Sequence, residues 1–258
     1  MKVDNLFIRT FDTRQELGET AAKMMADKVR ELLDVQQQVN IIFASAPSQN
    51  EFLATLAVEE DIAWERINAF HMDEYVGLSA DAPQNFGNFL KIKLFDRVNP
   101  GSIFYINGNA TDIDQECERY QDLLEKFPAD IVCLGIGENG HIAFNDPHVA
   151  DFNDPVLAKK VELDLASRNQ QVNDKCFETL NDVPTHAITL TITALMKARF
   201  AYCMVPGTTK AEAVLNTVMQ SISEEFPSTI LRNHTNAVLF IDKDSSGKLG
   251  KVASYNRV

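Results

Sequence analysis

The segment Ile131–Pro147 holds the residues whose types and spacing are best suited to chemistry. It begins with a short apolar run, Ile131–Leu134, which is typical of a buried parallel strand. Glycines then interrupt the pattern and permit positive φ angles and close approach of a ligand to the backbone; they are Gly135, Gly137 and Gly140. An amide, an imidazole and a carboxylate accompany them, at Asn139, His141 and Asp146.

The position of these groups favours a functional interpretation. In open α/β sheets, ligands bind beyond the carboxyl ends of the strands, where this segment would lie. A histidine followed closely by an acid suits proton transfer. The alternative is a strand-to-loop turn with an incidental histidine, because a strand followed by Gly-x-Gly is not a full dinucleotide-binding fingerprint.

Two other predicted strands also end in polar residues. Ile67–Met72 is followed by Asp73 and Glu74, which offer a candidate general base or, alternatively, a solvated turn. Val39–Ala46 is followed by a predicted helix that starts near Glu51. The end of this strand and the turn before the helix could cradle an anion through helix N–H groups and through the side chains of Ser45, Ser48 and Gln49. A simple turn with a Ser or Asn N-cap explains the same residues equally well.

Basic residues near the predicted loops are candidates for binding an anion. The strand Phe200–Val205 leads into a helix that opens around Lys210. A cation in the first turn of a helix is unfavourable with the helix dipole unless an anion lies nearby, so Lys210 is the better candidate. Arg168 and Lys175 could each meet a phosphate, although isolated basic residues are more often surface charges.

Strand and helix patterns alternate along almost the whole chain, which predicts an α/β fold with a mainly parallel sheet and helices on both faces. Thr13 and Glu16 form a capping box that opens a helix. Further helices are predicted over Asn85–Val98, Asp112–Phe127 and Thr193–Lys197, and further strands over Ile103–Ile106, Val161–Leu165, His186–Ile192 and Ala237–Ile241. No boundary interrupts the pattern, so residues 1–258 are predicted to form a single domain.

Composition limits the classes of function. The 258 residues are 45% hydrophobic and 24% charged, as expected for a globular protein, and the net charge of −13 argues against nucleic-acid binding. The absence of a signal-peptide pattern and of long apolar runs predicts a cytoplasmic protein without membrane contact. The four cysteines form no Cys-x-x-Cys pair, so we expect neither a metal site nor a disulfide.

Several stretches together resemble the glucosamine-6-phosphate deaminase family, in the same order and over nearly the whole chain. They are Met72–Gly77, Asn107–Asn109, Leu134–Pro147, Gly207–Val214 and Phe226–Ser228. The resemblance implies a modified Rossmann-like fold and conversion of an amino-sugar phosphate to a ketose phosphate and ammonia, with no cofactor. The wider superfamily includes 6-phosphogluconolactonases and sugar-phosphate-sensing domains.

The resemblance also implies roles for individual residues. Asp73 falls on the family's proton-abstracting carboxylate and His141 on its ring-opening histidine. Asn139 and Asp146 fall on the two groups that orient this histidine. The phosphate contacts fall on the loop after the first central strand, on Lys210 and on Lys175.

One loop departs from the family pattern. The family usually has a Thr-Gly-x-Thr run there, whereas this chain has Ala44–Asn50 without glycine. Lys175 in place of the family's arginine also loses bidentate geometry. The alternatives are therefore a galactosamine-6-phosphate deaminase, a 6-phosphogluconolactonase-like hydrolase and a non-catalytic sugar-phosphate sensor. The sequence leaves the oligomeric state open, with a homo-oligomer among the expectations.

Overall fold

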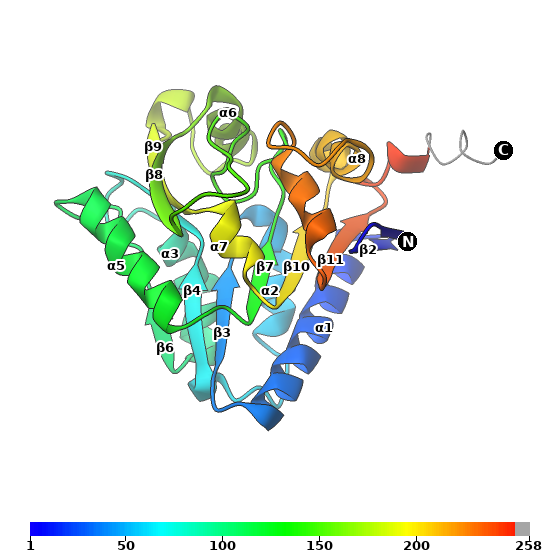
Figure 1. Ribbon diagram of the computed structural model, residues 1–258, viewed down its shortest axis with the longest axis horizontal. Coiled ribbons are helices and arrows are strands. Elements are labelled where there is room, and N and C mark those ends of the chain that lie inside the picture. Colours follow the sequence, from blue (N-terminus) through cyan, green and yellow to red (C-terminus); the bar gives the residue numbers. More distant parts are fainter. Residues whose placement is uncertain (251–258) are drawn as a thin grey trace.

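The computed structural model describes residues 1–250, which form a large sheet and a small one (Figure 1). The large sheet has the strand order β1-β2-β11-β10-β7-β3-β4-β6, and every neighbouring pair is parallel except β1 with β2. Its strands are β1 (Lys2–Val3), β2 (Leu6–Phe11), β3 (Val39–Phe43), β4 (Ile67–His71), β6 (Ser102–Phe104), β7 (Ile131–Leu134), β10 (Phe200–Val205) and β11 (Ala237–Asp242). The mainly parallel sheet that the sequence predicts is thereby confirmed.

Helices cover both faces of the large sheet, and the central strands are apolar on both sides for that reason. One face packs against α1 (Arg14–Val35), α2 (Asn50–Leu56) and α3 (Phe86–Leu90). A π-helical turn and α4 (Asp96–Val98) continue α3. The other face packs against α5 (Ile113–Lys126), α7 (Ile192–Met196) and α8 (Ala211–Met219). Alternation along β3 sends Ile41 and Phe43 to the first face and Ile42 to the second.

Several local predictions can be compared with the structure directly. The Thr13–Glu16 capping box opens α1, and β7 and β10 have the predicted bounds. The predicted strand Val161–Leu165 is displaced: strand β8 is Ala158–Glu162, and Leu165 already begins a helix. The reason is Asp164, whose carboxylate accepts a hydrogen bond from the Ser167 N–H and caps that helix.

A small antiparallel sheet lies above the carboxyl-terminal edge of the large sheet (Figure 1). It has the order β5-β9-β8 and comprises β5 (Asp73–Tyr75), β8 and β9 (His186–Leu190), and helix α6 (Leu165–Asn173) lies beside it. Only Met72 separates β4 from β5, and its carbonyl accepts a hydrogen bond from the Leu190 N–H at 2.7 Å. At the connection from β4 to β5, the chain thus passes from the large sheet to the small one through a single residue, which this bond holds in place.

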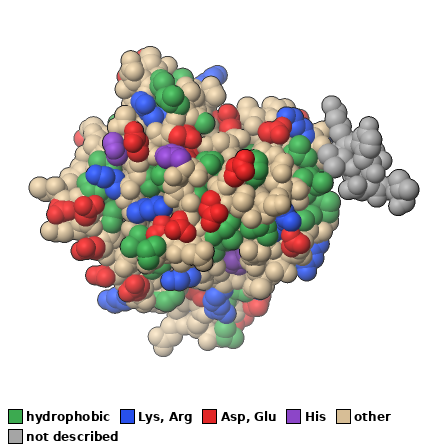
Figure 2. Space-filling model, turned by 45° about the horizontal axis from the view of Figure 1, so that its top comes forward, with side chains coloured by type: hydrophobic (Ala, Val, Ile, Leu, Met, Phe, Trp, Pro, Cys, Tyr) green, Lys and Arg blue, Asp and Glu red, His purple; other side chains and the backbone are tan. Residues whose placement is uncertain are grey.

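The outer surface shows no extended basic region on the side that Figure 2 displays, where acidic and basic side chains are interspersed. None of the helices within residues 1–250 combines the length and the apolar character that crossing a bilayer requires.

Candidate active site

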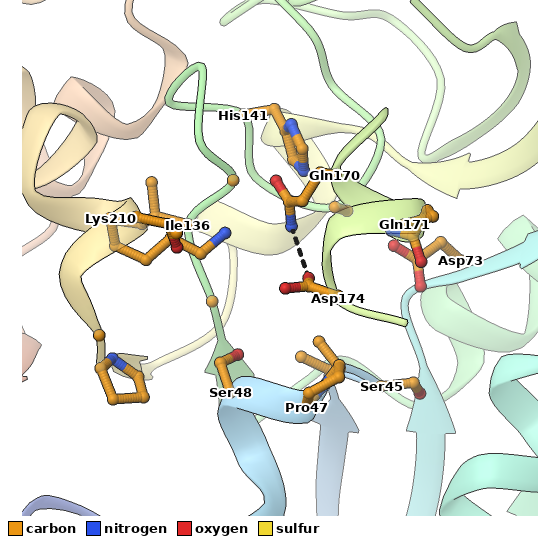
Figure 3. A pocket seen from close by; sticks show the side chains of 18 of the residues that line it. Ser45, Pro47, Ser48, Asp73, Ile136, His141, Gln170, Gln171, Asp174 and Lys210 are labelled. Atoms are coloured by element: carbon orange, nitrogen blue, oxygen red, sulfur yellow. Dashed lines mark hydrogen bonds between the residues drawn. The ribbon is translucent and has the colours of Figure 1, made fainter. Parts of the chain in front are cut away.

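A cleft opens where the large sheet ends and the small sheet begins (Figure 3). Its walls come from the turns that follow β3, β4, β7 and β10, together with α6. Seven of the residues singled out from the sequence line it: Ser45, Ser48, Asp73, Gly135, Gly137, His141 and Lys210. Asn139 and Asp146 do not line the cleft, but both contact the His141 side chain.

Hydrogen bonds on one side of its ring orient His141. Its Nδ1 lies 2.7 Å from Asn139 Oδ1 and 3.1 Å from Asp146 Oδ1. Asn139 Oδ1 also accepts from the His141 backbone N–H, and Asn139 Nδ2 donates to Asp146 Oδ1 at 2.9 Å. Because both oxygens at Nδ1 are acceptors, we assign the ring proton to Nδ1. Nε2 then carries a free electron pair and can take a proton from a bound molecule.

Asp146 is completely buried, with 0% of its surface exposed. Burial by itself would raise the pKa of this carboxyl group, but the hydrogen bonds from His141, Asn139 and Ser167 outweigh it and lower the pKa to about 2. Asp146 is therefore ionised at neutral pH and stabilises positive charge on the imidazole.

Ser167, from α6, completes the surroundings of the histidine, and the motifs in the sequence did not point to it. Its hydroxyl donates to Asp146 Oδ1 and lies 3.0 Å from His141 Nδ1. The usable signal was Asp164, because an Asp N-cap predicts that α6 begins one residue later and places Ser167 in its first turn.

Gly137 lies directly against the His141 ring. A β-carbon at this position would lie 2.1 Å from Cε1 and 2.2 Å from Nδ1 of that ring, far inside contact distance. The glycine is therefore required for the ring to pack against the turn, in addition to the open backbone expected from the sequence.

Gly137→Ala should displace the imidazole and lower kcat by about 10²-fold, which is the loss that an error of about 1 Å in position can cause. Overpacking should also lower the free energy of unfolding by about 1–3 kcal/mol. Gly135→Ala is the control on the same turn, because a β-carbon there would lie 3.3 Å from Ser48 Oγ and 3.4 Å from Gln49 Nε2, with the imidazole not among its contacts. Any effect of this control should fall on KM and not on kcat. Wild-type kcat in Gly137→Ala, measured together with its thermal unfolding, would show that the ring has room to move.

Asp73 is the first residue of β5 and lines the cleft. It is only 7% exposed, so its carboxyl group is largely shielded from solvent. Burial, and secondly the neighbouring charge of Glu74, raise the pKa of Asp73 well above its ordinary value. A carboxylate with a raised pKa is a stronger base than one in water.

Glu74 points away from the cleft, and it anchors the neighbouring helix. Its carboxylate accepts hydrogen bonds from the backbone N–H groups of Tyr75, Phe86 and Gly87 at 2.9 to 3.1 Å. Burial raises the pKa of Glu74 to about 7, although these hydrogen bonds oppose the rise. Glu74 therefore fixes the start of α3 to β5, next to the candidate base.

The turn after β3 has an unexpected construction. The Ser45 and Ser48 side chains lie at the cleft, but Gln49 is 0% exposed and is not among its lining residues. Its Nε2 instead donates to Ser48 Oγ at 3.0 Å and, at 3.3 and 3.4 Å, to the carbonyls of Leu134 and Met204. The prediction that Gln49 binds substrate is corrected: it joins the ends of β7 and β10 underneath the turn.

Lys210 faces the cleft and is only 5% exposed. Burial lowers the pKa of its ammonium group, while the negative charges of Asp174 and Glu138 oppose that shift. Lys175 is a second correction, because it lines a separate pocket on the far side of α6. It has a left-handed backbone with φ of 60°, and the preceding residue, Asp174, lines the cleft instead.

One group of potential metal ligands lies beside the histidine. Asp146, His148 and Asp164 place ligand atoms within 4.8 Å of one another. Oδ1 of Asp146 already accepts hydrogen bonds from Asn139 and Ser167, and Asp164 caps α6. Oδ2 of Asp146 is buried without a hydrogen-bond partner, so these contacts hold only one oxygen of that carboxylate.

Comparison with known proteins agrees with this geometry. Residues 12–240 match the family described as glucosamine-6-phosphate isomerases/6-phosphogluconolactonase. The glucosamine-6-phosphate deaminase of Bacillus cereus (strain B4264) is 33% identical over 233 residues, which cover 90% of this chain and 85% of the relative. A deaminase of the same name from Bacillus anthracis (strain CDC 684 / NRRL 3495) has the same identity and coverage.

Solved structures extend the comparison to the fold. A monomeric glucosamine-6-phosphate deaminase is 28% identical and superposes with a TM-score of 0.86, covering 93% of this chain and 99% of the other. The 6-phosphogluconolactonase from Trypanosoma brucei is 19% identical with a TM-score of 0.78, covering 94% and 98%, and shares the fold. The resemblance found in the sequence is confirmed, and the chain belongs to the enzyme family of glucosamine-6-phosphate isomerases and 6-phosphogluconolactonases.

Proposed function

We propose that this protein is an amino-sugar-phosphate deaminase that converts glucosamine 6-phosphate to fructose 6-phosphate and ammonia. The observation that carries the proposal is the presence in one cleft of a buried carboxylate, Asp73, and a histidine whose Nδ1 is bound to a buried aspartate. A hydrolase acting on a lactone needs a base to activate water, but it has no need of the second, buried carboxylate.

The first step is opening of the sugar ring. Nε2 of His141 takes the proton of the C1 hydroxyl group, and the imidazolium then protonates the ring oxygen as the C1–O5 bond breaks. The negative charge of Asp146 stabilises the imidazolium between these two transfers. The product of this step is the open-chain aldehyde.

The second step moves a proton from C2 to C1. Asp73 removes the C2 proton while the substrate's own ammonium group gives a proton to O1, which produces an enolamine. Asp73 then returns its proton to C1, which leaves an iminium group at C2. Water adds to that carbon, and ammonia departs to leave the ketone. The raised pKa of Asp73 suits both halves of this transfer, because the carboxylate is a competent base and its acid form a competent donor.

A phosphate on C6 would lie at the end of the cleft that Lys210 and Ser48 line. Binding energy at this end orients the reacting carbons without taking part in the chemistry. The substrate is therefore proposed to be a phosphorylated amino sugar, with the C4 epimer galactosamine 6-phosphate as the second candidate. Every residue invoked comes from one chain, so the proposed mechanism requires no particular oligomeric state.

The direct test is ammonia release from glucosamine 6-phosphate and from galactosamine 6-phosphate, measured side by side. We expect release from at least one, and the ratio of kcat/KM identifies the preferred epimer. Hydrolysis of 6-phosphogluconolactone serves as the third assay. Lactone hydrolysis without ammonia release from either sugar would contradict the proposal and favour the hydrolase. Binding of all three compounds without turnover would favour a sensor.

A further inference from the structure

A carboxylate stands at the same end of the cleft as Lys210. Asp174 directly follows α6, lines the cleft and is half-buried; Figure 3 shows it between Gln170 and the turn that carries Ser48. Gln170 Nε2 lies 3.4 Å from Asp174 Oδ2, and Gln170 Oε1 accepts from the Glu138 N–H at 2.9 Å. The position of Asp174 is therefore tied to the turn after β7.

The charges at this end do not suit a fully ionised phosphate. Glu138 adds a second carboxylate, and its Oε1 is buried without a hydrogen-bond partner. Arg14 also reaches the cleft, but its guanidinium already binds both carboxylate oxygens of Glu51 at 2.8 Å. A phosphate dianion would thus face Asp174 directly, and Glu138, which acts on Lys210 through its charge without lining the cleft, would add to the repulsion. Lys210 is the one cation here that has no partner among the described residues.

The protonated form of phosphate resolves this conflict. The second pKa of a phosphate monoester is about 6, so part of it is present as the monoanion close to neutral pH. The monoanion carries a P–O–H group that donates a hydrogen bond. An ionised carboxylate can only accept, so it attracts the monoanion and repels the dianion.

We propose that Asp174 is a specificity residue that selects the protonated form of the phosphate group. Its carboxylate accepts a hydrogen bond from P–O–H, while Lys210 and the Ser48 hydroxyl bind the remaining oxygens. This rests on the proposed function only in placing a phosphate at this end of the cleft. The same arrangement discriminates against sulfate, which has equal shape but no proton to donate.

Other titratable groups also face Asp174, and the test has to separate them from it. Besides burial, the charge of Asp174 raises the pKa of the Tyr75 and Cys176 side chains, and it opposes the lowering of the Lys210 pKa. His141 and Asp73 line the same cleft. A proton gained by any of these groups makes the cleft more positive and favours phosphate and sulfate alike. Only a carboxylate that accepts a hydrogen bond from the ligand favours phosphate over sulfate.

The experiment is calorimetric titration with methyl phosphate, a monoester whose dianion has no proton left to donate, and with sulfate, at constant ionic strength, near pH 6 and pH 8. The wild type should bind methyl phosphate at least about tenfold more tightly than sulfate near pH 6, the amount that one charge-assisted hydrogen bond supplies. The preference should shrink at the higher pH. Asp174→Asn should bind the two anions equally at both pH values, and should bind sulfate more tightly than the wild type does.

Glu178→Gln is the matched control, because Glu178 lies on the same segment but lines the pocket on the far side of α6. It should keep the preference of the wild type. A preference for phosphate that survives in Asp174→Asn, or equal binding of both anions by the wild type, would overturn the proposal. Binding of neither anion to any variant would overturn it too. The readout needs no turnover, so loss of anion selectivity and absence of deamination are separate results.

Discussion

Asp73→Asn should abolish most ammonia release while leaving substrate binding nearly intact. An asparagine has almost the same shape but cannot accept the C2 proton, and removing a positioned general base typically lowers kcat by about 10²- to 10⁴-fold. KM should change little, because the proposed binding groups lie elsewhere in the cleft. The measurement is steady-state kinetics of ammonia release on the preferred amino-sugar phosphate.

The same variant should be at least as stable as the wild type. Burial raises the pKa of Asp73, so the folded state loses stability relative to the unfolded state as pH rises above the unfolded pKa and up to the folded one. Asparagine removes that loss, so its melting temperature should match or exceed that of the wild type. Near-normal turnover in a folded Asp73→Asn would exclude Asp73 as the base, and lactone hydrolysis that persists would support the hydrolase.

Asp146→Asn should reduce turnover by a comparable factor for a different reason. The amide oxygen can still accept from Asn139, Ser167 and His141, so the geometry at Oδ1 is preserved. The negative charge that stabilises the imidazolium is lost. In serine proteases, the same change at the aspartate that orients the catalytic histidine costs about 10⁴-fold in kcat, and we expect about 10²- to 10⁴-fold here.

Asp164→Asn provides the control for that experiment. Asp164 lies close to Asp146 but makes no contact with the imidazole, and asparagine is as good an N-cap as aspartate. It removes one negative charge from the neighbourhood while preserving α6, so its loss in kcat should be far smaller. An equal loss of kcat in the two variants would mean that the total negative charge near His141 matters and that the direct contact between Asp146 and His141 does not.

The sequence predicted those features that are encoded locally. Strands β7 and β10 are apolar on both faces because helices bury both, and such runs are visible without any structure. Asn139, His141 and Asp146 lie within a few residues of one another, so one turn suffices to bring them together. The family resemblance named their roles, and the structure supplied the contacts.

The remaining features depend on how distant segments pack. Ser167 reaches His141 across 26 positions of sequence, and no spacing rule connects them. Lys175 was expected at the cleft because of its charge and because the family's arginine falls on it. It lines another pocket instead, and Asp174, one helical turn after Gln170, lies at the cleft. Gln49 was expected to help cradle an anion, yet it is buried against carbonyl groups that only the assembled sheet brings within reach.

The bond that holds Met72 has a consequence for the precision of the candidate base. The Met72 carbonyl accepts a hydrogen bond from the Leu190 N–H at 2.7 Å, and the next residue, Asp73, pairs with Thr189 across β5 and β9. The backbone of Asp73 is therefore held from two sides, by its link through Met72 to β4 and by its pairing with β9. A carboxylate on such a backbone loses little freedom when a sugar binds, so little binding energy is needed to align it with the reacting carbon.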